Sequence, residues 1–211
     1  MLGKACEDIG FFVIKNFGVD PQTVDNAWKS SADFFDLSHD EKIKLQKPQD
    51  EYPFGFNEIG AEILSDGKAK ETNASTTASL PDLKEMFSVG PKNPLAGFPP
   101  RQWPEHPESF AGDWDAYYEA MSDLANSILK AFALTLGLPS EDYFEQFTDH
   151  HGSAMRALNY PSLDGQTPVP GQIRASAHTV HNFTFAHTCV CSTSFLVQGI
   201  YSHSNNGPAY I

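Results

Sequence analysis

A long amphipathic segment at residues 110–136 constrains the fold of this chain most strongly. Its apolar side chains recur three or four residues apart, and Gly137 follows the last of them. The stripe consists of Trp114, Tyr117, Met121, Leu124, Ile128, Phe132 and Leu136. This spacing predicts one long helix with a buried face, and a glycine directly after it is typical of a helix end. We interpret the stripe as core packing and not as a cofactor site.

Shorter elements are predicted on both sides of the long helix. Before it, the patterns predict a helix at 2–8, a buried strand at 11–17, a helix opening at Pro21 and a capped helix at 38–45. Residues 83–89 fit either a strand or a short helix. After the long helix, Ser140 is placed to cap a short helix. The inward-facing side chains of that short helix are expected to be Tyr143, Phe144 and Phe147.

The pattern changes from helical to extended near residue 153. A strand is predicted at 153–160, a turn rich in proline and glycine at 161–171, and a second strand at 173–179. Helices come first and strands follow, which is typical of an α+β chain. We therefore expect an α-rich N-terminal region, residues 1–150, that leads into a β domain.

The composition changes again after Thr179. Residues 180–211 contain no Asp, Glu, Lys or Arg, and the last charged residue is Arg174. At ordinary composition, such a run has a chance probability of about one in ten thousand. The segment has no clear strand or helix period, and its polar residues exclude a membrane span. We treat residues 180–211 as an atypical, charge-free tail.

Charge and cysteine content exclude several classes of function. The formal net charge of −13 argues against a surface for nucleic acid or anionic membrane, which needs clustered Lys and Arg. No apolar run has membrane-spanning length, and no signal peptide opens the chain. Three cysteines do not form a disulfide framework, so a cytoplasmic location is expected. The sequence does not indicate an oligomeric state.

Short motifs follow one another in a fixed order along residues 2–179. They lie at 5–12, 16–19, 34–37, 55–56, 82–85, 103–104, 136–138, 156–161 and 174–179. Together they make the chain resemble the iron(II)- and 2-oxoglutarate-dependent dioxygenases of the isopenicillin N synthase-like group. The resemblance implies a non-haem dioxygenase N-terminal region over 1–150. It also implies that residues 151–179 are the first strands of an incomplete double-stranded β-helix, or jelly roll.

The resemblance also implies a chemistry and a set of site residues. Such enzymes hydroxylate or oxidise a small molecule while 2-oxoglutarate is decarboxylated to succinate, and two His and one carboxylate hold Fe(II). His178 matches the first metal ligand. Tyr160, which precedes Pro161, matches a tyrosine that hydrogen-bonds 2-oxoglutarate in many relatives. The family places Asp two residues after that His, but this chain has Val180 there. No later segment resembles the strand with the second His or the Arg-x-Ser pair.

We therefore assign no catalytic residue and expect this chain to be inactive by itself. Every Val codon begins with GT, as an intron does, so our hypothesis is that residues 180–211 are translated intron. One alternative is a non-catalytic fragment that acts as an interaction domain, because the open edge of an unfinished sheet invites pairing. Another is a metal-binding tail, although its spacing fits no structural zinc pattern. Its ligands would be His178, His181, His187, Cys189 and Cys191.

Overall fold

The computed structural model describes residues 2–47, 54–63, 80–93, 100–148, 151–163, 168–175, 185–187 and 195–198. These residues contain both helices and antiparallel strands, so the predicted α+β class is confirmed. The chain divides into two compact units. The first comprises Met1–Asp33, His106–His151 and His181–Asn205, and the second comprises Phe34–Glu105, Gly152–Val180 and Asn206–Ile211. No helix among the described residues is long and apolar enough to cross a membrane.

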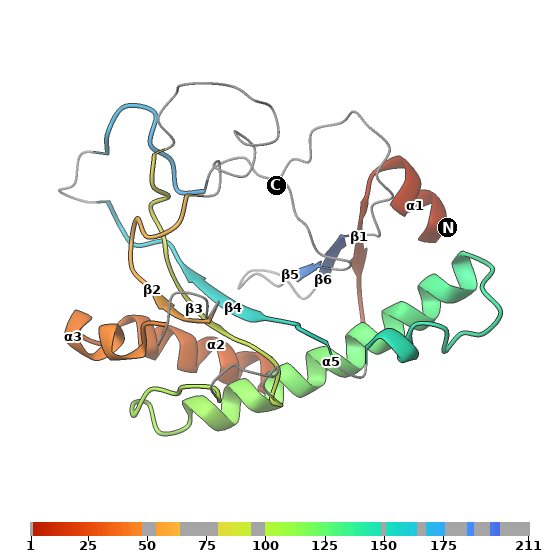
Figure 1. Ribbon diagram of the computed structural model, residues 1–211, viewed down its shortest axis with the longest axis horizontal. Helices are drawn as coiled ribbons and strands as arrows, with labels where there is room; N and C mark the ends of the chain where they lie inside the picture. The colour runs from red at the N-terminus through yellow and green to blue at the C-terminus, as the bar shows by residue number, and fades with distance from the viewer. Residues whose placement is uncertain are drawn as a thin grey trace. The chain divides into compact units, whose positions relative to one another are not determined.

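The first unit is organised on helix α5, Phe110–Thr135, which confirms the predicted long helix to within one residue. Gly137 follows with φ +67°, a left-handed conformation that favours glycine. The other elements are α1 (Leu2–Asp8), β1 (Phe11–Ile14), α2 (Pro21–Phe35, whose last two residues belong to the second unit), η2 (Glu145–Phe147), β5 (Phe185–His187) and β6 (Phe195–Gln198). Figure 1 shows β1, β5 and β6 as one sheet, in which β6 pairs antiparallel with both β1 and β5.

Most of the predicted apolar stripe of α5 is buried. Leu124, Ile128 and Phe132 form a core cluster, and Trp114 donates a hydrogen bond from Nε1 to Ser31 Oγ at 3.1 Å. Burial also raises the pKa of the Tyr117 hydroxyl from 10.0 to about 12. The prediction is wrong for Leu136, which is 57% exposed because the helix has already ended at Thr135.

Strand β1 is shorter and less buried than predicted. Phe12 and Ile14 pack on the α5 cluster, whereas Val13 between them is 54% exposed. Alternate side chains of a strand point to opposite faces, so only one face of β1 is covered. The charge-free tail supplies its pairing partner, with backbone register from Phe11↔Gln198 to Ile14↔Phe195.

The predicted short helix after α5 is a turn followed by a single 3₁₀ turn, η2. Ser140 does accept a hydrogen bond at Oγ from the Asp142 amide at 3.1 Å. Phe144 packs on the α5 cluster, but Tyr143 and Phe147 are exposed. The inward orientation predicted for those two side chains is therefore wrong, because a turn this short buries only one of the three.

The second unit is built on a three-stranded antiparallel sheet in the order β2-β3-β4 (Figure 1). Its elements are α3 (His39–Lys42), η1 (Ile43–Leu45), β2 (Gly55–Asn57), β3 (Glu85–Val89) and β4 (Met155–Asn159). The alternatives left open for residues 83–89 are thus decided in favour of a strand, and all five residues of β3 are buried. Residues 173–175 of the predicted second strand are not in a strand, and 176–179 lie outside the described residues.

One face of this sheet is packed with aromatic side chains. The register places Phe56 opposite Phe87, and Phe87 opposite Ala157. The Phe34 ring lies 4.9 Å from the Phe87 ring and 6.0 Å from the Phe56 ring, between ring centroids. Phe34, Phe56 and Phe87 are almost completely buried, so they form the apolar centre of the second unit.

Candidate functional site

Tyr160, the predicted 2-oxoglutarate contact, lies directly after the last residue of β4. Its side chain is 42% exposed, so solvent or a ligand can reach it. Pro161 follows, and a residue before proline is held in an extended conformation. Tyr160 is therefore biased toward an extended backbone, although β4 itself ends at Asn159.

Three hydrogen bonds hold the segment that leads toward His178. Gln172 donates from Nε2 to the Pro81 carbonyl at 2.9 Å, and the Leu83 amide donates to the Ile173 carbonyl at 3.1 Å. Arg174 donates from Nη1 to the Pro161 carbonyl at 3.1 Å. The structure thus brings Arg174 to the residue after Tyr160. His178, the predicted metal ligand, lies outside the described residues.

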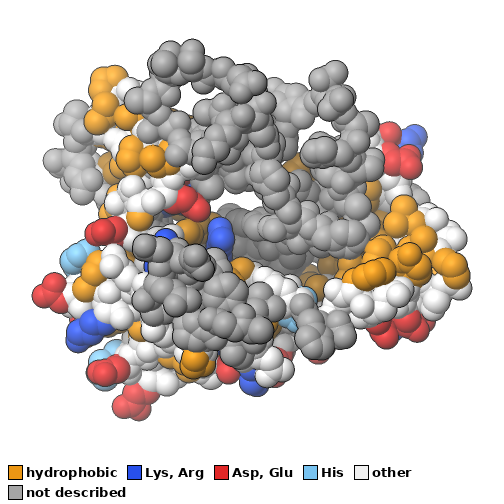
Figure 2. Space-filling view, viewed as in Figure 1, with side chains coloured by type: hydrophobic (Ala, Val, Ile, Leu, Met, Phe, Trp, Pro, Cys, Tyr) orange, Lys and Arg blue, Asp and Glu red, His pale blue; other side chains and the backbone are white. Residues whose placement is uncertain are grey.

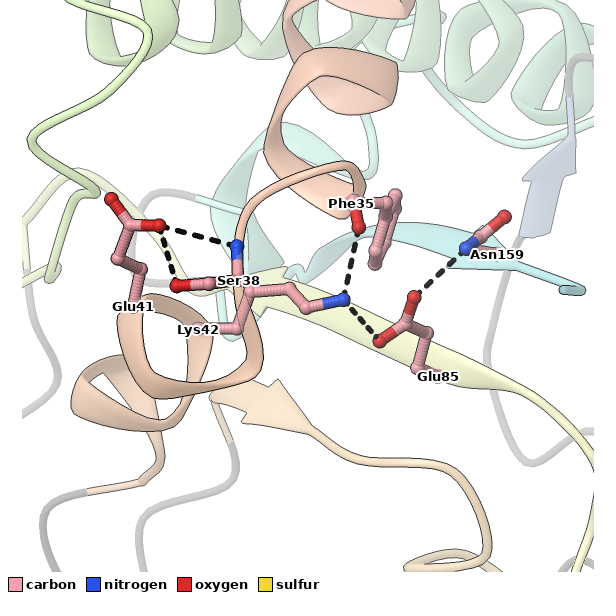
Figure 3. Close-up of polar contacts among 6 residues, drawn as sticks. All are labelled: Phe35, Ser38, Glu41, Lys42, Glu85 and Asn159. Atoms are coloured by element: carbon pink, nitrogen blue, oxygen red, sulfur yellow. Dashed lines mark hydrogen bonds and ion pairs between the residues drawn. The ribbon is translucent and has the colours of Figure 1, made fainter.

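A buried polar network fixes the end of β4, as Figure 3 shows. Lys42 on α3 donates from Nζ to Glu85 Oε2 at 2.9 Å and to the Phe35 carbonyl at 2.9 Å. Asn159 on β4 donates from Nδ2 to Glu85 Oε1 at 2.8 Å. Lys42 is 8% exposed and Glu85 is 6% exposed. Buried charges need such partners, so α3, β3 and β4 are joined through the Glu85 carboxylate, which binds the residue before Tyr160.

The capping pair predicted for residues 38 and 41 presents Lys42 to this network. Ser38 donates to Glu41 Oε2 from its amide at 3.2 Å and from Oγ at 2.6 Å (Figure 3). These contacts start α3 at His39, so Lys42 falls in its first turn. The Lys42 Nζ also lies 5.5 Å from the centre of the Phe56 ring. The cation is therefore held by a carboxylate, a carbonyl and an aromatic face.

A second set of buried charges precedes β3. Lys84 Nζ lies 2.7 Å from Glu62 Oε2 and 3.6 Å from Asp82 Oδ2. Lys84 and Glu85 are consecutive, so their side chains leave the strand on opposite sides. Sequence reasoning treated residues 82–85 only as a family motif and missed these roles. The sequence did contain a sign of these buried charges, because Lys84 and Glu85 stand directly before the apolar residues of β3.

The described residues do not fit an iron centre. Among them, no group of three or more His, Cys, Asp or Glu side chains is arranged to hold a metal ion. In the sequence, Val180 stands where the family pattern needs a carboxylate, and a valine side chain cannot bind a metal. Of the tail residues considered as metal ligands, His181, Cys189 and Cys191 lie outside the described residues. For His187 only the backbone of β5 is described.

Comparison with known families supplies the deciding observation. The family described as "non-haem dioxygenase in morphine synthesis N-terminal" matches residues 1–106. The chain belongs to the iron(II)- and 2-oxoglutarate-dependent dioxygenase superfamily. The resemblance predicted from the ordered motifs is thereby confirmed, and the match falls within the region 1–150 assigned to the N-terminal part of such an enzyme.

Characterised dioxygenases resemble this chain over most of its length. The 2-oxoglutarate-dependent dioxygenase thnC of Trichoderma harzianum is 30% identical over 179 residues, which make up 82% of this chain and 52% of that protein. The homoarginine-6-hydroxylase 2-ODD-C23.1 of Arabidopsis thaliana is 24% identical over 187 residues, 84% of this chain and 52% of that protein. The chain spans about half the length of the curated relatives it matches.

Solved dioxygenase structures share the fold. A full-length Neurospora crassa protein, crystallised in complex with alpha-KG, matches with a TM-score of 0.69 and 23% identity, covering 90% of this chain and 63% of that chain. JOX2 in complex with 2OG, Fe and JA matches with a TM-score of 0.66 and 21% identity, covering 94% and 60%. Fe(II) and 2-oxoglutarate are thus the cofactors of the dioxygenase family, as expected from the resemblance.

Proposed function

We propose that this chain is a member, or a fragment of a member, of the oxygenases that hydroxylate or oxidise a small molecule and convert 2-oxoglutarate to succinate. We also propose that the 211 residues do not carry out this reaction by themselves. The observation that carries both statements is the order of family motifs up to His178, followed by Val180 in the place of the Asp ligand.

Each segment has a role under this proposal. Residues 1–150 form the N-terminal region, and residues 151–179 form the first strands of an incomplete jelly roll. Tyr160 is the contact for 2-oxoglutarate, which is supported by its exposed side chain at the end of β4. His178 is the first iron ligand. Arg174 holds the main chain at Pro161 and has no catalytic role.

The first prediction concerns iron binding by the purified chain. We expect less than stoichiometric iron when the chain is loaded with Fe(II) and 2-oxoglutarate without oxygen, and no succinate once air is admitted. Val180→Asp supplies a carboxylate two residues after His178 and is expected to tighten iron binding by about tenfold or more, without turnover. Metal analysis after gel filtration measures the iron, and chromatography measures succinate.

Val180→Asn is the matched control, because asparagine has the size of aspartate without its charge. It should bind iron more weakly than Val180→Asp, and His178→Ala in the Val180→Asp background should return the affinity to that of the unaltered chain. Stoichiometric iron together with succinate formation by the unaltered chain would contradict the proposal.

We further propose that the charge-free tail is translated intron. An open strand edge accepts an extended segment of any origin, so the pairing of β6 with β1 is compatible with this origin. Sequencing of the transcript across codon 179 tests the proposal. The expected result is a spliced message in which an Asp codon follows codon 179. Abundant mature message with Val180, and no Asp-initiated exon downstream in the genome, would contradict it.

One observation favours a second candidate, a non-catalytic interaction domain. Figure 2 shows hydrophobic side chains gathered over the surface formed by the C-terminal end of α5. Leu134, Leu136 and Phe147 are exposed side chains of this part of the chain. Exposed apolar patches mark interaction sites in soluble proteins. Under this alternative, analytical ultracentrifugation shows association that Leu134→Ser with Phe147→Ser abolishes, and neither metal binding nor turnover occurs.

A further inference from the structure

The short stretch of chain before β3 joins two segments that are far apart in the sequence. On one side, the Asp82 amide donates to the Glu62 carbonyl at 3.0 Å, and the Gly60 amide donates to the Asp82 carbonyl at 3.2 Å. On the other side, the Leu83 amide donates to the Ile173 carbonyl at 3.1 Å. Main-chain hydrogen bonds therefore tie this stretch to both of its neighbours.

Buried charges hold the same stretch through its side chains. Asp82 and Lys84 are buried, and Lys84 Nζ lies 2.7 Å from Glu62 Oε2 and 3.6 Å from Asp82 Oδ2. A buried cation needs its carboxylate partners, so the position of Lys84 restrains both acidic side chains. Because Glu62 belongs to a separate segment, Lys84 fixes that segment against the start of β3.

Different contacts hold the end of β4 and the segment that leads toward His178. Glu85 accepts a hydrogen bond from Asn159, the last residue of β4 (Figure 3). We call residues 172–174 the return segment, and Leu83 holds this segment through its hydrogen bond to the Ile173 carbonyl. The two attachments use different residues, so each can be broken separately.

We propose that Lys84 is a positioning residue, which holds the return segment in place and through it the main chain beside Tyr160. The return segment includes Arg174, which donates to the Pro161 carbonyl at 3.1 Å, directly after Tyr160. The effect of Lys84 passes along these hydrogen bonds and needs no contact with a ligand. This inference rests on the proposed function, because Tyr160 is the proposed contact for 2-oxoglutarate.

Amide hydrogen exchange of the full 211-residue chain tests the proposal. Lys84→Met removes the cation and keeps an unbranched side chain of similar length. The Leu83 amide, which donates to the return segment, should then exchange about tenfold faster or more relative to the Phe87 amide in the middle of β3. An effect of Lys84 on global stability alone would accelerate both amides equally.

Lys42→Met is the matched control, because Lys42 is also a buried lysine of the second unit with a carboxylate partner. It should accelerate exchange at Asn159 and leave the exchange of Leu83 relative to Phe87 unchanged. Equal acceleration of Leu83 and Phe87 in Lys84→Met, or the same pattern of exchange in both variants, would overturn the proposal.

Glu62→Gln is the second variant, which keeps the size of the side chain and removes the charge that Lys84 contacts at 2.7 Å. Glu62 is less buried than Lys84, so this variant should perturb the fold less. It should accelerate Leu83 relative to Phe87 in the same direction as Lys84→Met and by a smaller factor. If Lys84→Met does not fold, an unchanged ratio in Glu62→Gln would overturn the proposal.

A titration with 2-oxoglutarate, followed by nuclear magnetic resonance at Tyr160, separates this proposal from the proposed function. Under both, 2-oxoglutarate shifts the Tyr160 signals, and Lys84→Met weakens the binding by about threefold or more. If 2-oxoglutarate shifts no signal while Lys84→Met still accelerates Leu83, the positioning of the return segment stands and the assignment of Tyr160 is wrong. If 2-oxoglutarate binds equally well with and without Lys84, the positioning role is wrong.

Discussion

Replacement of Phe87 by alanine is expected to lower the free energy of unfolding by ~3–5 kcal/mol. Phe87 has no exposed surface and lies in the middle of β3, the central strand of its sheet. Its ring packs against Phe34 at 4.9 Å between centroids. Removing the ring leaves a cavity between Phe34 and the sheet. Because domains have total stabilities of ~5–15 kcal/mol, the loss is a large fraction of the whole.

Urea unfolding followed by tryptophan fluorescence measures this change, and Phe147→Ala is the matched control. Phe147 is 63% exposed, so its replacement should change the stability by less than ~0.5 kcal/mol. Phe87→Leu keeps most of the side-chain volume and should remain folded if Phe87→Ala does not. Similar effects of Phe87→Ala and Phe147→Ala would show that the sheet of the second unit does not depend on this ring.

Elements with a strong local pattern were predictable from the sequence. The period of α5 is set by residues within one or two turns of each other, and Gly137 marks its end locally. The same holds for α2, which opens at Pro21, and for α3, which starts after the Ser38–Glu41 pair. Where a predicted side-chain position failed, the error concerned burial. Val13 and Phe147 are apolar but exposed, because exposure depends on which distant segments cover a residue and not on its neighbours in sequence.

The candidate site was predictable only in part. The order of short motifs indicated the family and pointed to Tyr160, whose side chain is accessible in the structure. The hydrogen bond from Arg174 to the Pro161 carbonyl, beside Tyr160, could not be predicted. A main-chain carbonyl accepts a hydrogen bond whatever its side chain is, so the sequence contains no sign of this contact. Lys42 and Glu85 were missed for a different reason. Charged residues are normally expected at the surface, so neither side chain was expected to be buried. The two residues are also 43 positions apart, so no local pattern links them.

Removal of the Glu85 carboxylate is expected to lower the free energy of unfolding by ~3–5 kcal/mol, because breaking a buried ion pair leaves the other charge uncompensated. In Glu85→Ala, Lys42 Nζ loses its carboxylate and Asn159 Nδ2 loses its acceptor. Lys42→Met should be destabilising for the same reason. The double variant Lys42→Met with Glu85→Leu replaces both charges by apolar groups, so it should be less destabilised than the sum of the single effects.

A double-mutant cycle by urea unfolding measures this coupling, and the exposed Lys29–Asp33 pair on α2 is the matched control. That pair is screened by solvent, so its two single effects should simply add. Additive effects at Lys42 and Glu85 would contradict the prediction.

The network also has a local consequence for the site. Asn159 holds the end of β4 to Glu85 and directly precedes Tyr160. Glu85→Ala should therefore speed amide hydrogen exchange at Asn159 and Tyr160 more than at Ile128, which lies in the core of the first unit. Uniform acceleration at all three amides would mean that Glu85 acts only on global stability and does not position Tyr160.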